Sequence, residues 1–337
     1  MANVERVRTA PLPPRTAARS RIGNVGQTAG AAAFLVLLLL YNALFNADAF
    51  LNAQSFRLNL TQVAPIVIVA VGMTLVVATG GIDLSVGSLM AIAGAVAPLI
   101  FLSDRAPFSL PYLGGTLAYV IPVAVAGLFG FFNGWLVTSF RLQPIIATLV
   151  LFVAGRGVAQ VITDGRLQSF REPDWQFIGL GRVLGVPFQA VLMAIVVAVA
   201  AWAMRATTFG RYVLAVGDNE AAARLSGVPA DRVKRAVYAI SGLLSGLAGL
   251  IFIAINSSSD ANQIGLNVEL DAIAAVAVGG TSLLGGRATI IGTLIGAFII
   301  QLIRFTLLTQ NVSDATARVV TAAAIIVGVL VQRRRSS

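Results

Sequence analysis

Long apolar runs separated by short polar gaps fill this chain from about residue 27 onward. A helix needs roughly 20 apolar residues to cross the hydrocarbon of a bilayer. Two runs, 88–103 and 271–285, are short enough to be broken or re-entrant spans. The pattern predicts an all-α integral membrane protein with about ten transmembrane helices, or eight if the short runs do not cross. The candidate spans are 27–46, 60–79, 88–103, 116–138, 145–162, 186–204, 236–256, 271–285, 288–308 and 316–332.

These spans form one predicted transmembrane domain, 27–332, with polar ends. We interpret residues 1–26 as a basic cytoplasmic tail and not as a cleaved signal peptide, because no small-residue cleavage site follows the first apolar run. Residues 333–337 form a second short tail. With the N-terminus inside, sixteen Lys and Arg residues lie in cytoplasmic segments and five in external loops. This bias predicts that both termini are cytoplasmic.

Composition supports a membrane protein and disfavours an enzyme. Hydrophobic residues make up 57% of the 337 residues and charged residues 11%, whereas soluble domains carry about a quarter charged residues. The chain has no cysteine and no histidine, so the commonest metal ligands and general base are absent. We expect no catalytic residue and no metal site. The net charge of +10 lies in the gaps and at the ends, which fits membrane topology better than nucleic-acid binding.

The longest internal gap predicted to face the cytoplasm, 205–235, has a helical pattern of its own. Gly217 permits a turn, Asp218 or Asn219 can cap a helix N-terminus, and Glu220 suits the positive end of the helix dipole. Three alanines then favour a helix that stops near a glycine, and a second helix can begin at a proline. The pattern predicts two short helices across the membrane exit, with an ordinary solvated loop as the alternative. The alanines, glycine and proline are Ala221, Ala222, Ala223, Gly227 and Pro229.

Two glycine-rich turns interrupt the apolar runs, at 79–88 and 278–286. Asp83 and Ser85 can cap the start of the span at 88–103, and we favour that role over solute contact. A gating hinge is the alternative. The residues of these candidate structural or gating turns are Gly80, Gly81, Asp83, Ser85, Gly279, Gly280, Ser282, Gly285 and Gly286.

Other candidate sites are weaker. The pattern G-x-x-x-x-G-K-[ST] of a phosphate-binding loop is absent, so another chain must bind ATP if ATP drives this protein. Interhelical hydrogen bonds are the favoured role of the polar residues that could line a path. The loop at 163–185 is large enough to dock a delivery protein. The candidate path-lining residues are Asn133, Gln160, Asn256 and Gln301.

Three stretches together resemble the ribose/xylose/arabinose/galactoside branch of bacterial ABC importer permeases. They are GGIDLSVGS at Gly80–Ser88, GRYVLAVGDNEAAARLSGV at Gly210–Val228, and AVAVGGTSLLGGRATIIGTLIGA at Ala275–Ala297. The resemblance covers nearly the whole chain after the basic tail. One departure is Arg287-Ala288, where a further glycine is expected.

The resemblance implies a type II-like ABC importer permease bundle in a bacterial inner membrane, carrying a monosaccharide or sugar-like solute by alternating access. It implies ABC ATPase subunits that bind ATP and Mg, a second permease that is identical or a sister chain, and a periplasmic substrate-binding protein. This chain would bind no cofactor. A branched-chain-amino-acid-type permease and a stand-alone secondary transporter or facilitator are the alternatives. The residues implied to couple to the ATPase are Gly210, Arg211, Gly217, Asp218, Asn219, Glu220, Ala221, Ala222, Ala223 and Gly227.

Overall fold

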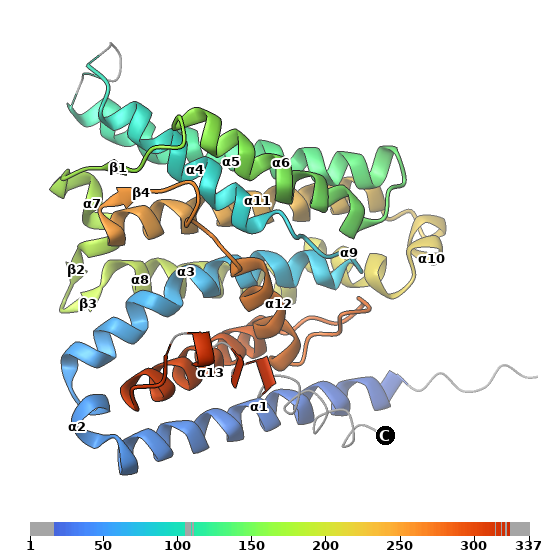
Figure 1. Cartoon of the computed structure of the whole chain (residues 1–337). Helices are drawn as coiled ribbons and strands as arrows, with labels where there is room; N and C mark the ends of the chain where they lie inside the picture. Colours follow the sequence, from blue (N-terminus) through green and yellow to red (C-terminus); the bar gives the residue numbers. More distant parts are fainter. Residues whose placement is uncertain are drawn as a thin grey trace, which may run out of the picture.

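The computed structural model describes residues 17–104, 109, 111–313, 315–317, 319–320 and 322–323. Within these residues the chain is an elongated bundle of helices with very little sheet, as the apolar pattern predicted (Figure 1). The helices are α1 (Ala17–Phe45), α2 (Ala47–Phe50), α3 (Ala53–Ala78), α4 (Val86–Phe101), α5 (Pro111–Ser139), α6 (Pro144–Ile162), α7 (Pro173–Leu180), α8 (Phe188–Ala206), α9 (Thr208–Asp218), α10 (Glu220–Leu225), α11 (Ala230–Asn256), α12 (Val268–Val278) and α13 (Ile290–Thr309).

Short elements gather at the two ends of the bundle. Strand β1 (Gln168–Ser169) pairs antiparallel with β4 (Ser258–Ser259), and β2 (Arg182–Val183) pairs with β3 (Val186–Pro187). The four strands, α2 and α7 lie at one end, and α9 and α10 lie at the opposite end (Figure 1). The loop predicted to be external and the segment predicted to face the cytoplasm are therefore at opposite ends.

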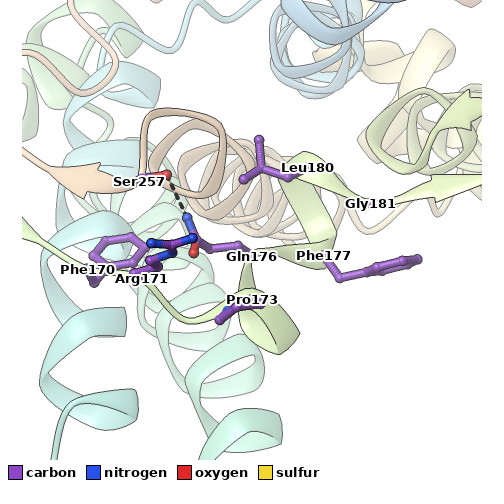
Figure 2. Close-up of a pocket in the computed structure, with 8 residues that line it drawn as sticks. All are labelled: Phe170, Arg171, Pro173, Gln176, Phe177, Leu180, Gly181 and Ser257. Atoms are coloured by element: carbon purple, nitrogen blue, oxygen red, sulfur yellow. Dashed lines mark hydrogen bonds between the residues drawn. The ribbon is translucent and has the colours of Figure 1, made fainter.

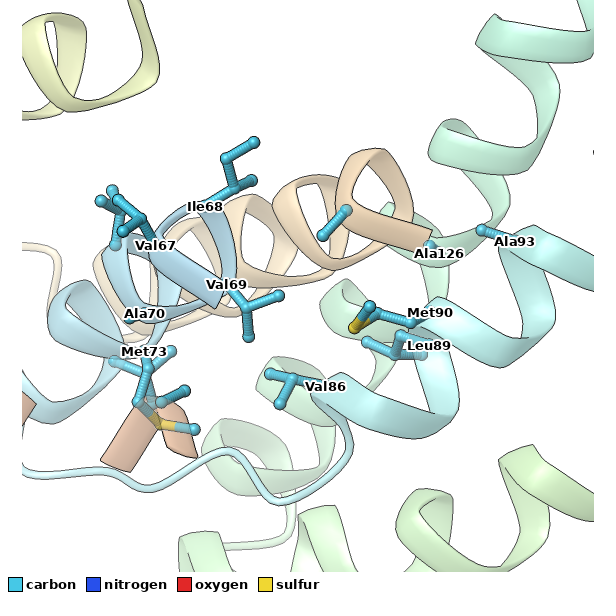
Figure 3. Close-up of a cluster of buried hydrophobic side chains, with 14 of the residues drawn as sticks. Val67, Ile68, Val69, Ala70, Met73, Val86, Leu89, Met90, Ala93 and Ala126 are labelled. Atoms are coloured by element: carbon cyan, nitrogen blue, oxygen red, sulfur yellow. The ribbon is translucent and has the colours of Figure 1, made fainter. Parts of the chain in front are cut away.

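Helix α3 is the centre of the bundle. From Val63 to Ala78 every residue except Ile66 is buried, as expected of a helix that is apolar on all sides. Figure 3 shows buried side chains of the hydrophobic core, among them Val67, Val69 and Met73 of α3 and Val86 and Met90 of α4. Helices α8, α11, α12 and α13 pack on α3, and α4 and α5 pack on α11 and on each other.

Small residues let α5 and α11 approach closely. A Cβ at Gly130 would lie 3.0 Å from the Cα of Gly242, and a Cβ at Gly246 would lie 3.0 Å from the Cα of Val123. Close backbone contact through small residues is the usual basis of helix association in membranes. Dispersion contacts between these two backbones therefore hold the pair together.

Seven described helices are long and apolar enough to cross a membrane: α1, α3, α5, α6, α8, α11 and α13. The two runs predicted to be short are short helices. Helix α4 has 16 residues, and α12 has 11 and follows an irregular segment. Helix α1 begins at Ala17, within the predicted polar tail 1–26, and its apolar, membrane-length part is Thr28–Phe45. The rest of that tail, most of the span at 316–332 and the tail 333–337 lie outside the described residues.

Candidate coupling junction

The segment predicted to couple to a motor contains α9, α10 and the start of α11. The interpretation of Gly217 as a turn is wrong, because Gly217 lies inside α9. The helix expected to begin at Pro229 is also not a separate short helix, because α11 continues from Ala230 through the span. The predicted cap of α10 is confirmed for Asn219, whose side-chain oxygen accepts a hydrogen bond from the Ala222 amide at 3.0 Å.

The end of α10 follows the predicted glycine stop. Gly227 has φ +83°, a backbone conformation that glycine adopts without steric cost. The Val228 amide donates a hydrogen bond to the Ala223 carbonyl at 3.0 Å, and the Gly227 amide donates to the Arg224 carbonyl at 3.0 Å. This pair of bonds is the Schellman arrangement. Gly210 serves a different purpose, because a Cβ there would overlap the backbone of Met204 at the end of α8.

Gly217 lies where α9 meets both glycine-rich turns. The Gly286 amide donates to the Ala78 carbonyl at 3.0 Å, which joins the α12–α13 turn to the end of α3. A Cβ at Gly217 would overlap that carbonyl oxygen and lie 2.5 Å from the Gly286 nitrogen. Gly285, with φ +88°, lies in the same contact, because a Cβ there would lie 2.8 Å from the Gly217 oxygen. We call Ala78–Gly80, Gly217–Asp218 and Gly285–Gly286 the coupling junction.

The remaining turn residues lie around this junction. A Cβ at Gly81 would lie 2.6 Å from the Tyr238 hydroxyl, and one at Gly279 would overlap Gly292 on α13. The Gly280 amide donates to the Ala277 carbonyl at 3.1 Å, and the Ser282 carbonyl accepts from Gly285 at 3.1 Å. The turns are therefore closely packed against α11, α13 and α9.

Ion pairs hold α10 against the first turns of α11. Arg224 bonds Glu220 at 2.7 Å and Asp231 at 2.5 Å, and Lys234 also pairs with Glu220. Burial raises the pKa of Glu220, but the hydrogen bonds from Lys234 and Arg224 outweigh that effect and leave its pKa below the ordinary value. The charged network therefore favours one position of α10.

This network predicts a pH dependence for the position of α10. Because the pKa of Glu220 is lowered on folding, its stabilisation is complete above the ordinary pKa of a glutamate and is lost as pH falls through the lowered value. A spin label on Ser226→Cys, the sole cysteine in such a chain, should keep constant mobility from neutral pH to about pH 5 and become more mobile at more acidic pH. Asp231, whose pKa the hydrogen bond from Arg224 also lowers, would titrate in the same acid range. In a Glu220→Gln, Asp231→Asn double variant, which removes both carboxylates paired with Arg224, the label should be mobile throughout. An acid transition that persists in that double variant would contradict this assignment.

Asp83 is fully buried at the start of α4 and accepts three hydrogen bonds. Ser85 donates its amide at 3.1 Å and its hydroxyl at 2.6 Å to one carboxylate oxygen, and Ser241 of α11 donates to the other at 2.9 Å. Asn133 of α5 donates to the Ser85 hydroxyl oxygen at 2.8 Å. Ser85 occupies the N-cap position of α4 without a side-chain capping bond, so the predicted capping role of its side chain is wrong. The cluster instead joins the α3–α4 turn to α5 and α11.

The four candidate path-lining residues do not converge. Asn133 is buried in the Asp83 cluster, and Gln301 of α13 donates to Gln62 at 2.8 Å and to Asn59 at 3.2 Å on α3. These two make the interhelical hydrogen bonds that were the favoured interpretation. Gln160 donates to Asn262 at 2.7 Å, whereas Asn256 bonds the Phe252 carbonyl of its own helix at 2.8 Å.

Sequence reasoning did not single out Glu269, which is buried in the first turn of α12. One of its buried carboxylate oxygens has no hydrogen-bond partner within the described residues, while the guanidinium of Arg156 of α6 bonds backbone carbonyls of the segment before α12. A signal was present in the sequence, since an ionisable residue within or beside an apolar run indicates a functional or structural polar site in a membrane protein.

The end of the bundle with the strands carries a pocket of about 430 Å³. Figure 2 shows Phe177 and Leu180 of α7 on one side and the hydrogen bond from Gln176 to the Ser257 hydroxyl, 2.7 Å long. The lining residues are Phe170, Arg171, Pro173, Gln176, Phe177, Leu180, Gly181 and Ser257. Among the described residues, no group of three or more acidic, His or Cys side chains is placed to hold a metal ion.

Comparison with known proteins gives matches over most of the chain. The family described as branched-chain amino acid transport system / permease component matches residues 57–330. The galactofuranose transporter permease of Escherichia coli is 41% identical over 82% of this chain and 79% of its own. The ribose import permeases of Haemophilus influenzae and Bacillus subtilis are 40% and 36% identical, over 88% and 95% of this chain and 90% and 97% of theirs. No solved structure gives a significant match. The chain therefore belongs to the branched-chain amino acid transport system / permease component family and is a transmembrane permease subunit.

Proposed function

We propose that this chain is the membrane-spanning subunit of an ATP-driven importer that carries a monosaccharide or sugar-like solute across the inner membrane. The solute class rests on the relatives, which are permeases named for ribose and galactofuranose. The observation that carries the energy coupling is the junction at Gly217, where α9 contacts two turns that connect membrane helices. A push on α9 reaches both turns through backbone contacts.

The face offered to a motor is small and apolar. Ala221 and Ala222 are exposed on α10, and Leu225 is 92% exposed at its end. Arg211, Asp218 and Asn219 add polar groups around it. A helix with small exposed side chains fits closely into a groove on another protein, so we place the ATPase here, with ATP and Mg bound on that partner.

Two further partners follow from the same proposal. A second permease, identical or a sister chain, completes the translocation path. A periplasmic substrate-binding protein docks at the strand-bearing end, where the pocket beside α7 offers Arg171 with Phe177 and Leu180. This arrangement requires the end with α9 and α10, and both termini, to be cytoplasmic, in agreement with the distribution of Lys and Arg.

Reconstitution tests the proposed function directly. Proteoliposomes containing this chain, its ATPase and solute-loaded binding protein should take up solute only with ATP, and the chain alone should take up none. Concentrative or passive uptake by the chain alone would instead support a secondary transporter or facilitator. Uptake of branched-chain amino acids in place of sugars would retain the ATP-driven importer and change the solute class.

Replacing Ala222 by tryptophan should uncouple the motor. The bulky side chain occupies the exposed face of α10 without disturbing its own helix, so we expect ATP-driven uptake to fall about tenfold or more, a loss of about 1.4 kcal/mol of coupling. The measurement is uptake alongside stimulated ATP hydrolysis. Ala154→Trp, at an exposed alanine of α6, is the control and should retain uptake. Normal coupling in Ala222→Trp would remove α10 from the docking face.

A further inference from the structure

The backbone between β4 and α12 is irregular inside a helical bundle. Residues 260–267 form no helix or strand, and α12 begins only at Val268. Helix α12 has 11 residues, which at 1.5 Å per residue is about 16 Å, roughly half of the ~30 Å hydrocarbon thickness. The C-terminal end of α12 leads into the glycine-rich turn of the coupling junction. The irregular segment before α12 therefore runs from the strand-bearing end to about the middle of the bundle.

Arg156 of α6 satisfies much of this irregular backbone. Its guanidinium donates to the carbonyls of Ala261 at 2.8 Å, Asn262 at 3.2 Å and Ile264 at 3.1 Å. Three hydrogen bonds from one side chain indicate that the backbone of this segment holds a fixed position.

Side chains hold the same segment on α4 and α6. The Ser259 hydroxyl donates to the Gly94 carbonyl of α4 at 2.8 Å. Gln160 of α6 donates to the Asn262 side-chain oxygen at 2.7 Å, and Asp260 accepts from the Asn262 amide groups at 2.9 and 3.0 Å. These hydrogen bonds therefore fix the position of residues 259–262 against α4 and α6.

The outer surface of this segment is exposed in the single chain. Asn262, Gln263 and Leu266 are all exposed, and no hydrogen bond within the described residues uses the Gln263 side-chain amide. Irregular backbone does not face lipid within the hydrocarbon region, because lipid cannot satisfy its polar groups. This face must therefore contact water or protein.

We propose that residues 260–267, with Arg156 and Gln160, form a wall of the water-filled solute path, and that the side-chain amide of Gln263 binds hydroxyl groups of the passing solute. The identity of the solute as a carbohydrate rests on the proposed function. The Gln263 amide, which is exposed and makes no side-chain hydrogen bond within the described residues, suits a polyhydroxylated molecule, whereas an apolar or purely anionic solute would not need it. Arg156 is a positioning residue here, since its guanidinium bonds the backbone of the wall.

The absence of native cysteine makes the wall testable by accessibility. Gln263→Cys should react with a membrane-impermeant, positively charged methanethiosulfonate in assembled transporter in cells, about tenfold faster or more than a lipid-facing cysteine, because charged reagents do not enter hydrocarbon. Phe131→Cys, from the exposed apolar patch of α5, is the lipid-facing control. Leu184→Cys, 99% exposed at the strand-bearing end, reports correct insertion.

Three outcomes decide the proposal. Fast labelling at residue 263 that also blocks uptake supports it, whereas labelling at residue 184 serves only to confirm insertion, because that residue lies in the loop proposed to dock the binding protein. Labelling at residue 263 no faster than at residue 131, while residue 184 reacts, would overturn it. A disulfide between two Gln263→Cys chains that, once reduced, leaves residue 263 unreactive toward the charged reagent would also overturn it, because that residue would then lie in a dry contact between copies. Labelling needs no transport, so it succeeds or fails independently of ATP dependence.

Discussion

Gly217→Ala should abolish ATP-driven uptake while the ATPase still hydrolyses ATP. The added Cβ would overlap the Ala78 carbonyl oxygen and approach the Gly286 nitrogen, and both are backbone atoms that cannot rotate away. Forcing extra volume into such a contact costs about 1–3 kcal/mol, so α9 must move off the two turns. We expect uptake to fall by more than about tenfold, measured in proteoliposomes together with ATP hydrolysis.

The matched control is Gly115→Ala in α5, because a Cβ at Gly115 meets no atom within 4 Å. Alanine also favours a helix over glycine by about 0.5–1 kcal/mol, so this variant should be as stable as the native chain or slightly more stable. Native uptake in Gly217→Ala would show that α9 transmits no movement through the coupling junction. Loss of ATPase assembly along with uptake would show instead that the residue serves folding alone.

Asp83→Ala should cause the largest loss of stability among single substitutions in the bundle interior. It removes the acceptor of three hydrogen bonds and leaves the Ser85 amide hydrogen and the Ser85 and Ser241 hydroxyl hydrogens without an acceptor. Interhelical hydrogen bonds in membranes contribute about 0.6–1.7 kcal/mol each, and orphaned buried donors cost about 1–3 kcal/mol. We expect a loss of about 2–4 kcal/mol, read as a fall in Tm from the fluorescence of the three tryptophans.

Two companion variants separate the hydrogen bonds from simple loss of volume. Ser241→Ala removes one donor and should cost about 1 kcal/mol. Asp83→Asn keeps the shape and one acceptor oxygen, so its Tm should lie between those of Asp83→Ala and the native chain. Equal Tm values for Asp83→Ala and the native chain would show that the buried cluster does not stabilise the bundle.

The spans were predictable because lipid imposes a simple rule on sequence. Apolar runs gave the places of α3, α5, α6, α8, α11 and α13, and the two short runs marked α4 and α12. Helix α9 was missed for a physical reason: glycine at position 217 usually indicates a turn, but here it allows close contact inside a helix.

The partners of the turn residues could not be predicted from spacing. Ala78, Gly217 and Gly286 are far apart in the sequence and meet only because three separate connections reach the same end of the bundle. The Asp83 cluster was half predicted, since the acid was recognised but its partner Ser241 lies on a distant helix. The wall at 260–267 has no apolar periodicity, so its place inside the bundle depends on Arg156 and becomes evident only in three dimensions.

Helix α11 joins the two water-facing ends of the protein without interruption. It has 27 residues, about 40 Å at the usual rise. The serine that follows it receives the hydrogen bond from Gln176 of α7, while Asp231 and Lys234 in its first turns hold α10. A continuous helix held at both ends can transmit movement along its length. Under the proposed function, a binding protein that tilts α11 at the strand-bearing end would therefore also displace α10, where the ATPase is proposed to dock. Docking of the loaded binding protein would then be transmitted to the ATPase before the solute moves.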